Sequence, residues 1–329
     1  MQLFDQGKPP VGIVFDSDFG DRIDSVLALA LLYGFDGRNE ARVVSVSVSK
    51  SNLKAAALCE VVVRFYAGPI GPFTRILPVG MSTEGRLPED TPILAVAAKY
   101  ENRIHNLNDT AEVKALIRNA LTAQYDQNCV VLAAGPLTNL ARALELPGVK
   151  ELVAAKVRYL VAAVGAFPQG GPDGNLRADA AVARQVLAAW PTPVVACGAE
   201  FDEALRFPAE SIEKDFAWSQ AHPVADAYRA AQPMPYDAPA RAMAAALYAV
   251  RPNESYFKLS APGTITVTDD GRSRFTPSDG GRHRYLVADP AQKDRILQVF
   301  REVSSARPVP RVPRFLKAQE QKKAQEEKK

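Results

Sequence analysis

Four aspartates follow directly on a short apolar segment near the start of the chain. The apolar segment covers residues 11–15, and the aspartates are Asp16, Asp18, Asp21 and Asp24. Carboxylates crowded at the end of a buried strand repel one another and lose hydration, so each is costly there. Such a cluster persists most readily around a hard cation or a polyhydroxyl ligand. The segment is therefore our first candidate site, at the strand end where ligands bind in open α/β sheets.

The residues after the strand also allow a purely structural interpretation. Gly20 permits a sharp turn, and Asp24 and Ser25 fall at the expected start of a helix, where both residue types cap well. Capping alone is thus an alternative role for these two side chains. An EF-hand loop is excluded, because Gly stands at the fifth place of the loop instead of the sixth and the Glu required at the twelfth is absent.

Three further polar segments follow apolar runs later in the chain, and each is ambiguous by itself. Residues 135–139, Gly-Pro-Leu-Thr-Asn, break one run and begin a helical pattern. Asp173 and Asn175 alternate in a loop, where they could offer an acceptor and an amide to hydroxyl groups. Asp237 precedes an alanine-rich helical pattern. Because Asp and Asn are more often turn formers or caps, the chemical interpretation depends on these segments occurring together.

The segments that must position these side chains predict an α/β fold. Short uninterrupted apolar runs are typical of parallel strands covered on both faces. The runs cover residues 11–15, 43–48, 129–134, 157–164 and 193–197. The clearest helical patterns cover 53–66, 110–125, 139–144 and 180–189, and further helices are expected over 26–32 and 238–249. Their alternation predicts a Rossmann-like, mostly parallel central sheet with helices on both faces.

The C-terminal part differs in its pattern. Residues 256–285 alternate and contain Asp-Gly and Gly-Gly turn signals, which predicts a small antiparallel extension. Residues 289–303 predict a last helix, with Asp289 as its cap and Pro290 at its first position. We expect one domain over residues 1–305, followed by a proline-spaced and Lys/Gln/Glu-rich tail over residues 306–329.

Composition excludes several classes of protein. The chain has 329 residues, 23% charged and 47% apolar, and its net charge of +3 includes a basic tail, so a nucleic-acid partner is not expected. Cys59, Cys129 and Cys197 lie far apart in apolar runs, which predicts buried thiols and not disulfides or a zinc site. No apolar run is long enough to cross a membrane, and the first ten residues lack the pattern of a signal peptide. We expect a cytoplasmic protein, although a trimmed exported form would look the same.

Together, the polar segments resemble the inosine–uridine-preferring nucleoside hydrolase family, in its bacterial branch. That family begins with Asp-x-Asp-x-Gly after a strand and further acids near a helix start. It continues with a Gly-Pro-Leu-Thr-Asn-like turn, an acid-x-Asn loop followed by Asp, and a late Asp at a helix start. The matching residues here are Asp16, Asp18, Gly20 and Asp24, then 135–139, then Asp173, Asn175 and Asp179, and finally Asp237.

The resemblance implies a hydrolase that cleaves the N-glycosidic bond of ribonucleosides or related N-ribosides, as in purine and pyrimidine salvage. A bound Ca²⁺ would hold the nucleophilic water and two ribose hydroxyls, and Asp18 would be both a metal ligand and the general base. The ligands carried over are Asp18, Asp24, Ser25, the carbonyl of Ala134 and Asp237. The substrate-binding residues carried over are Asp24, Asp173, Asn175, Tyr236 and Asp237. The resemblance also implies a homodimer or homotetramer.

Several residues depart from the family pattern. Ser25 stands where a second acid and metal ligand is usual, and Arg22 stands where many relatives have an acid, so both weaken the expected calcium site. Asp173 is one methylene shorter than the usual Glu, and Tyr236 replaces a His that acts on the leaving base in some members. The three histidines of the chain lie elsewhere and are expected to be structural or exposed: His105, His222 and His283.

These departures leave two alternatives open. The first is a degenerate member that binds a nucleoside or sugar without turnover, which Ser25 and Arg22 favour. The second is a haloacid dehalogenase-like phosphatase, because Asp16-x-Asp18 after a strand also suits an aspartyl nucleophile. The Lys and the acid pair that such a phosphatase needs have no convincing place in the sequence.

Overall fold

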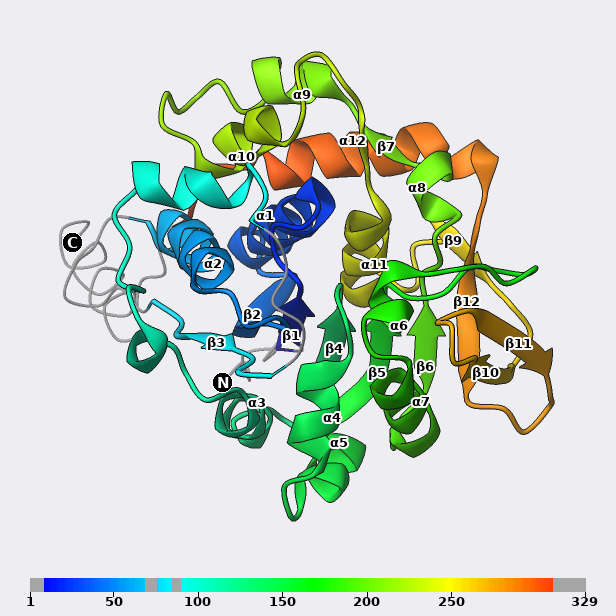
Figure 1. Cartoon of the computed structure of the whole chain (residues 1–329). Coiled ribbons are helices and arrows are strands. Elements are labelled where there is room, and N and C mark those ends of the chain that lie inside the picture. Colours follow the sequence, from blue (N-terminus) through cyan, green and yellow to red (C-terminus); the bar gives the residue numbers. More distant parts are fainter. Residues whose placement is uncertain (1–8, 69–75, 85–89, 310–329) are drawn as a thin grey trace, which may run out of the picture.

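The computed structural model describes residues 9–68, 76–84 and 90–309, and within them ten strands form one central sheet. Parallel strands make up most of it: β1 (Val11–Ser17), β2 (Ala41–Val48), β3 (Val79–Met81), β4 (Cys129–Ala133), β5 (Val157–Ala162), β6 (Val194–Ala196) and β12 (His283–Ala288). The antiparallel strands are β9 (Phe257–Leu259), β10 (Gly263–Val267) and β11 (Ser273–Pro277). The order is β11-β10-β12-β6-β5-β4-β1-β2-β3, with β9 paired to β12 (Figure 1).

Helices cover both faces of this sheet because the side chains of each strand alternate in direction. In β1, Ile13 and Phe15 join one apolar cluster, whereas Val14 joins the other. The first cluster includes α1 (Ile23–Gly37), α2 (Leu53–Ala67), α10 (Pro223–Ala231), α11 (Arg241–Val250) and α12 (Lys293–Ser304). The second includes α3 (Val113–Thr122), α4 (Thr138–Leu144), α5 (Val149–Lys156) and α7 (Ala180–Ala189). The predicted fold class is confirmed.

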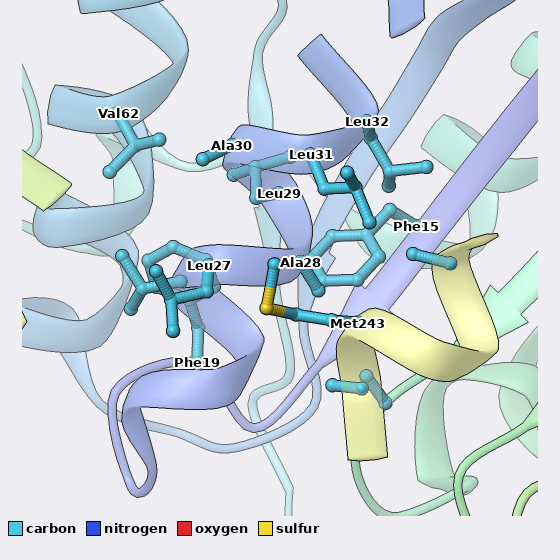
Figure 2. Packing of buried hydrophobic residues seen from close by; sticks show 14 of the residues in the cluster. Phe15, Phe19, Leu27, Ala28, Leu29, Ala30, Leu31, Leu32, Val62 and Met243 are labelled. Carbon is cyan, nitrogen blue, oxygen red and sulfur yellow. The ribbon is translucent and has the colours of Figure 1, made fainter. Parts of the chain in front are cut away.

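The centre of the first cluster lies between β1 and the helices α1, α2 and α11. Phe15 of β1, Leu27 of α1, Val62 of α2 and Met243 of α11 are all buried members of this cluster, and Figure 2 shows their side chains among these elements. Helix α1 is buried nearly all round, since Ile23–Leu32 is an unbroken apolar run apart from Asp24 and Ser25. This packing fixes the start of α1 against the end of β1, where the aspartates lie.

Most predicted elements have the predicted positions, with small differences at their ends. Strand β1 runs two residues further than expected, so Asp16 and Ser17 belong to the strand itself. The Asp289 side chain caps the last helical segment by accepting from Ala291 N, as predicted, although a 3₁₀ turn (Pro290–Gln292) precedes α12. All three cysteines are buried free thiols, as predicted.

One predicted helix begins at a different residue. The alanine-rich helix was expected from residue 238, but α11 begins at Arg241. The residues before it form β8 (Ala238–Pro239), which pairs with β7 (Arg206–Phe207). This short sheet uses the backbone that would otherwise have formed the first turn of the helix.

The antiparallel extension predicted near the C-terminus is present, and it packs against the loop that follows β5. Ser273 Oγ accepts from Ala166 N at 2.9 Å and donates to the Ala166 carbonyl at 3.1 Å. The Phe167 ring stacks on Tyr285 of β12, with 4.7 Å between ring centroids. The β10–β11 hairpin and β12 therefore support the loop that leads to the polar residues after β5.

Two predictions concern the ends of the chain. The first eight residues and residues 310–329, most of the predicted tail, lie outside the described residues. Among the described residues, no helix is long and apolar enough to cross a membrane.

Candidate active site

The candidate site lies at the carboxyl ends of β1, β2, β4 and β5. In the sheet, β2 and β3 lie on one side of β1, whereas β4 and β5 lie on its other side, so the strand order reverses at β1. In open α/β sheets, ligands bind in the crevice at the carboxyl ends of the strands where the order reverses. Asp16 lies at this edge with no exposed surface, and its Oδ1 accepts from Ser47 Oγ at 2.5 Å and Asn139 Nδ2 at 2.7 Å. Asp16 thus joins β1 to β2 and to α4.

Asp18 is the half-buried carboxylate just beyond the end of β1. Burial and then the charge of Asp21 raise its pKa from 3.8 to about 7, and Lys50 opposes the rise. Ser17 Oγ donates to Asp18 Oδ1 at 3.3 Å. Within the described residues, Asp18 makes no direct ion pair. It is thus a carboxylate that can accept a proton near neutral pH.

A close approach of two strand ends holds the backbone of Asp18. Gly135 follows β4, and a Cβ placed on it would lie 2.3 Å from Asp18 N and 2.7 Å from Ser49 Oγ. Ala134 N donates to the Asp16 carbonyl at 2.7 Å, which fixes the same contact. Only glycine leaves room for the backbone of residue 135 this close to the site.

Lysine 50 enters the cluster from the end of β2. Its ammonium group pairs with Asp21 Oδ1, and its side chain is only 6% exposed. A lysine so deeply buried is stable as a cation only beside an anion. The Asp21–Lys50 pair therefore places a fixed positive charge beside Asp18.

Arginine 22 provides a second cation. It binds Asp202 through two hydrogen bonds of 2.8 and 2.5 Å, and its Nη2 lies 3.4 Å from Asp24 Oδ2. Asp24 also accepts from Ala242 N at 3.2 Å, at the start of α11. Burial raises the pKa of Asp24, whereas Arg22 and Arg241 oppose that rise. Asp24 does not cap its own helix, so the capping alternative is wrong for it.

The third cation, Arg241, comes from the first residue of α11. Its Nη1 donates to Asp173 Oδ2 at 2.6 Å, and the two side chains are 7% and 1% exposed. The other oxygen of Asp173 accepts from Leu176 N at 2.9 Å and caps the short helix α6 (Gly174–Ala178). Asn175 lies beside it and donates to the Ala163 carbonyl at the end of β5 at 2.8 Å. The loop after β5 is thus joined to α11 by a buried ion pair.

Three of the predicted site residues do not take the expected places in this cluster. Asp237 is exposed, and its Oδ1 accepts from Ala209 N at 2.9 Å because α11 begins four residues later than Asp237. Ser25 lies in the first turn of α1, and its Oγ donates to the carbonyl of the N-cap residue Arg22 at 3.0 Å. Tyr236 is also held away, with its hydroxyl donating to the Tyr228 carbonyl at 2.6 Å.

These contacts do not fit the predicted calcium site. Calcium needs six to eight converging oxygen ligands, and those expected here were Asp18, Asp24, Ser25, the carbonyl of Ala134 and Asp237. Asp237 and Ser25 are engaged elsewhere, and Asp24 faces N–H donors of Arg22 and Ala242. Within the residues that the structure describes, no group of three His, Cys, Asp or Glu side chains is arranged to hold a metal ion. We therefore derive no step through calcium.

Lys50, Asp202 and Arg241 were not predicted from the sequence. Each is an ordinary charged residue in a helix or loop pattern, and its partner lies far away along the chain. A lysine two residues after the apolar run 43–48 was the one signal in the sequence that could have drawn attention to Lys50. The residue after Lys50, Ser51, lines an open pocket of about 440 Å³. Its other lining residues include Leu53, Met81, Asp90 and Leu107.

Comparison with known proteins agrees with the sequence motifs. The family model described as inosine-uridine preferring nucleoside hydrolase matches residues 13–305. A search of curated proteins finds no match. The chain is similar to solved structures of an inosine-uridine preferring nucleoside hydrolase from Bacillus anthracis (18% identity, 90% and 99% of the two chains, TM-score 0.65) and a purine-preferring ribonucleoside hydrolase from Gardnerella vaginalis (15%, 89% and 98%, 0.66). It is also similar to an inosine-guanosine nucleoside hydrolase (16%, 89% and 98%, 0.70).

Proposed function

The chain belongs to the inosine-uridine preferring nucleoside hydrolase family, whose members are glycosidases that act on N-glycosyl compounds, and we propose that it uses Asp18 as its general base. The substrate is a ribonucleoside or related N-riboside, cleaved by water into a free base and ribose. The observation that carries this proposal is Asp18 itself. It lies at the end of β1, it is free of a direct ion pair within the described residues, and its pKa is raised to about 7.

The proposed step needs only water and this carboxylate. Asp18 accepts a proton from a water molecule as the oxygen of that water forms a bond to the anomeric carbon. The N-glycosidic bond breaks, its electron pair leaves with the base, and the base takes up a proton from solvent to give the free base. A general base works best when its pKa lies near the pH of the reaction, and the pKa of Asp18 meets that condition.

The neighbouring polar groups are suited to hold the ribose. Asp24 accepts from Ala242 N through Oδ2, and Asn175 donates through Nδ2. Among the described contacts, Asp24 Oδ1 and the Asn175 side-chain oxygen are thus available to accept from sugar hydroxyls. Arg241 uses one N–H on Asp173 and retains further donors. We propose that Asp24, Asn175 and Arg241 contact the hydroxyls, and that Asp173 acts by positioning Arg241.

Binding of a nucleoside or sugar without turnover is the second candidate function. The specific observation in its favour is that Arg22 and Lys50 pair with carboxylates around Asp18. The aspartyl phosphatase alternative is not retained, since the family match covers residues 13–305. A homodimer or homotetramer, and a place in nucleoside salvage, stay predictions.

The test compares ribose release and ligand binding in three proteins. Wild type, Asp18→Asn and Asp237→Asn are incubated with a panel of purine and pyrimidine ribonucleosides, and released reducing sugar is measured beside calorimetric binding. Asp237→Asn is the matched control, because its amide oxygen can still accept from Ala209 N outside the cluster. We expect release by wild type and the control and its loss in Asp18→Asn. Binding without release in wild type would favour the second candidate, and neither binding nor release would overturn both.

A further inference from the structure

Three cations lie among the carboxylates of the site, and each makes an ion pair there. We call Arg22, Lys50 and Arg241 the internal cations. Lys50 pairs with Asp21, Arg22 with Asp202 and Asp24, and Arg241 with Asp173. They come from the loop after β1, the end of β2 and the start of α11, so they enter the cluster from three separate elements.

Burial makes these pairs more than ordinary surface contacts, although in the pair of Arg22 and Asp24 the arginine side chain is 40% exposed and only the aspartate, at 7%, is nearly buried. The side chains of Lys50 and Arg241 are 6% and 7% exposed. A charge so far from water is costly unless an opposite charge compensates for it, and the same holds for the carboxylates that face it. Each internal cation therefore lowers the cost of burying the acids around it, which is the electrostatic role that a bound metal ion would otherwise have.

The internal cations also direct N–H donors to the places where a metal would need oxygen ligands. Asp24 Oδ2 is faced by Arg22 Nη2 and by Ala242 N. Arg241, whose charge also acts on Asp24, directs its Nη1 to Asp173 Oδ2, although Asp173 was not among the expected metal ligands. A cation entering this space would meet the positive ends of these groups at close range, and Coulomb repulsion would oppose its binding.

We propose that the three internal cations replace a divalent metal in this site, which therefore has no functional Ca²⁺ requirement. The inference deepens the proposed function and rests on it for the identity of the site, but its test does not require turnover. Positive charge is supplied by side chains that cannot be removed by a chelator.

The experiment measures Ca²⁺ binding by calorimetry and the Tm in Ca²⁺ or EDTA, on the full chain stripped with a chelator. Wild type is compared with Arg22→Gln/Ser25→Asp, which removes one internal cation and restores an acid at the start of α1. A ligand that binds only the folded protein raises Tm as its concentration rises. We expect no binding heat and an unchanged Tm for wild type, and both heat and a raised Tm for the double variant.

Two results would overturn the inference. One is Ca²⁺ binding by wild type that is lost in Asp18→Ala, and the other is a folded double variant that binds no Ca²⁺. Should the double variant fail to fold, Lys50→Gln removes the cation beside Asp21 and is tested in the same way. Ribose release measured in Ca²⁺ and in EDTA separates the two proposals. No Ca²⁺ binding with no release in either solution refutes turnover alone, whereas Ca²⁺ binding with release that is lost in EDTA refutes the inference alone.

Discussion

The buried ion pair between Arg241 and Asp173 gives the sharpest test of how the site is held together. Arg241→Met keeps much of the volume of the side chain but leaves the Asp173 carboxylate, 1% exposed, without its ion pair. Removing one partner of a buried pair typically costs about 3–5 kcal/mol, because the remaining charge is uncompensated. The hydrogen bond from Leu176 N to Asp173 remains and does not neutralise the charge.

That loss is large enough to measure by thermal unfolding. Unfolding entropy near the midpoint is about 2.1 cal/mol/K per residue. Over the 329 residues of the chain, it converts a loss of 3–5 kcal/mol into a fall in Tm of about 4–7 °C. The measurement is circular dichroism during heating at pH 7, with urea unfolding of the same samples as a second estimate of the free energy.

A double-mutant cycle isolates the ion pair from other effects of the substitution. Asp173→Asn removes the charge and keeps an oxygen that can accept from Leu176 N, so Arg241→Met/Asp173→Asn should be more stable than Arg241→Met alone. Lys54→Met, which breaks an exposed pair with Asp90, should change Tm little. The reasoning would be refuted by a loss below about 1 kcal/mol in Arg241→Met, or by additive effects in the cycle.

Three further predictions concern the base, the strand contact and a buried histidine. Ribose release should fall as pH drops below about 7, because Asp18 must lose its proton to act as base; kcat/KM against pH is the measurement. Gly135→Ala should cost about 1–3 kcal/mol by overpacking, since its Cβ would lie 2.3 Å from Asp18 N, whereas Gly280→Ala, with nothing within 4 Å of its Cβ, should change urea stability by less than about 0.5 kcal/mol. Burial lowers the pKa of His222 from 6.5 to about 4, so protonation favours the unfolded chain and stability is lost as pH falls below 6.5. Between pH 7.5 and 5 this loss of stability amounts to about 2 kcal/mol. His222→Phe should lack this loss, so its free energy of unfolding in urea should fall less with pH than that of wild type; an equal pH dependence in both proteins would contradict the prediction.

The strands and the position of the site could be predicted because they depend on local pattern. An apolar run buried on both faces is visible in the sequence, and polar residues directly after it must lie at the sheet edge. Asp16, Asp18 and Asp24 were placed correctly at that edge for this reason. The prediction for the histidines is also confirmed: His105 is exposed, and His283 is buried with its Nδ1 accepting from Ile265 N.

The partners of the aspartates could not be predicted, because they are set by tertiary packing. Arg22 lies 180 residues from Asp202, and Arg241 lies 68 residues from Asp173. No local spacing relates such pairs. The placement of Asp237 failed for a related reason: Asp before Ala-Pro-Ala has the composition of a helix cap, but pairing with β7 moved the start of α11 to residue 241.

The contact between the hairpin and the loop after β5 joins two segments that lie about a hundred residues apart. Besides the bonds of Ser273, Pro172 forms an isolated bridge with Arg272, and a Cβ on Gly271 would lie 2.5 Å from the Cα of Arg177. The loop cannot open while these contacts hold. Its amide protons should therefore exchange with solvent together with those of the hairpin, as one cooperative unit.

This coupling has a consequence for how such a pocket can diversify. Asp173 and Asn175 are held at the end of a loop whose other side rests on β10 and β11. Substitutions in this hairpin can therefore shift Asn175 and the pair of Asp173 with Arg241. Directed evolution aimed at a new riboside would find useful variation in residues 263–277, far in sequence from Asp18, the proposed general base.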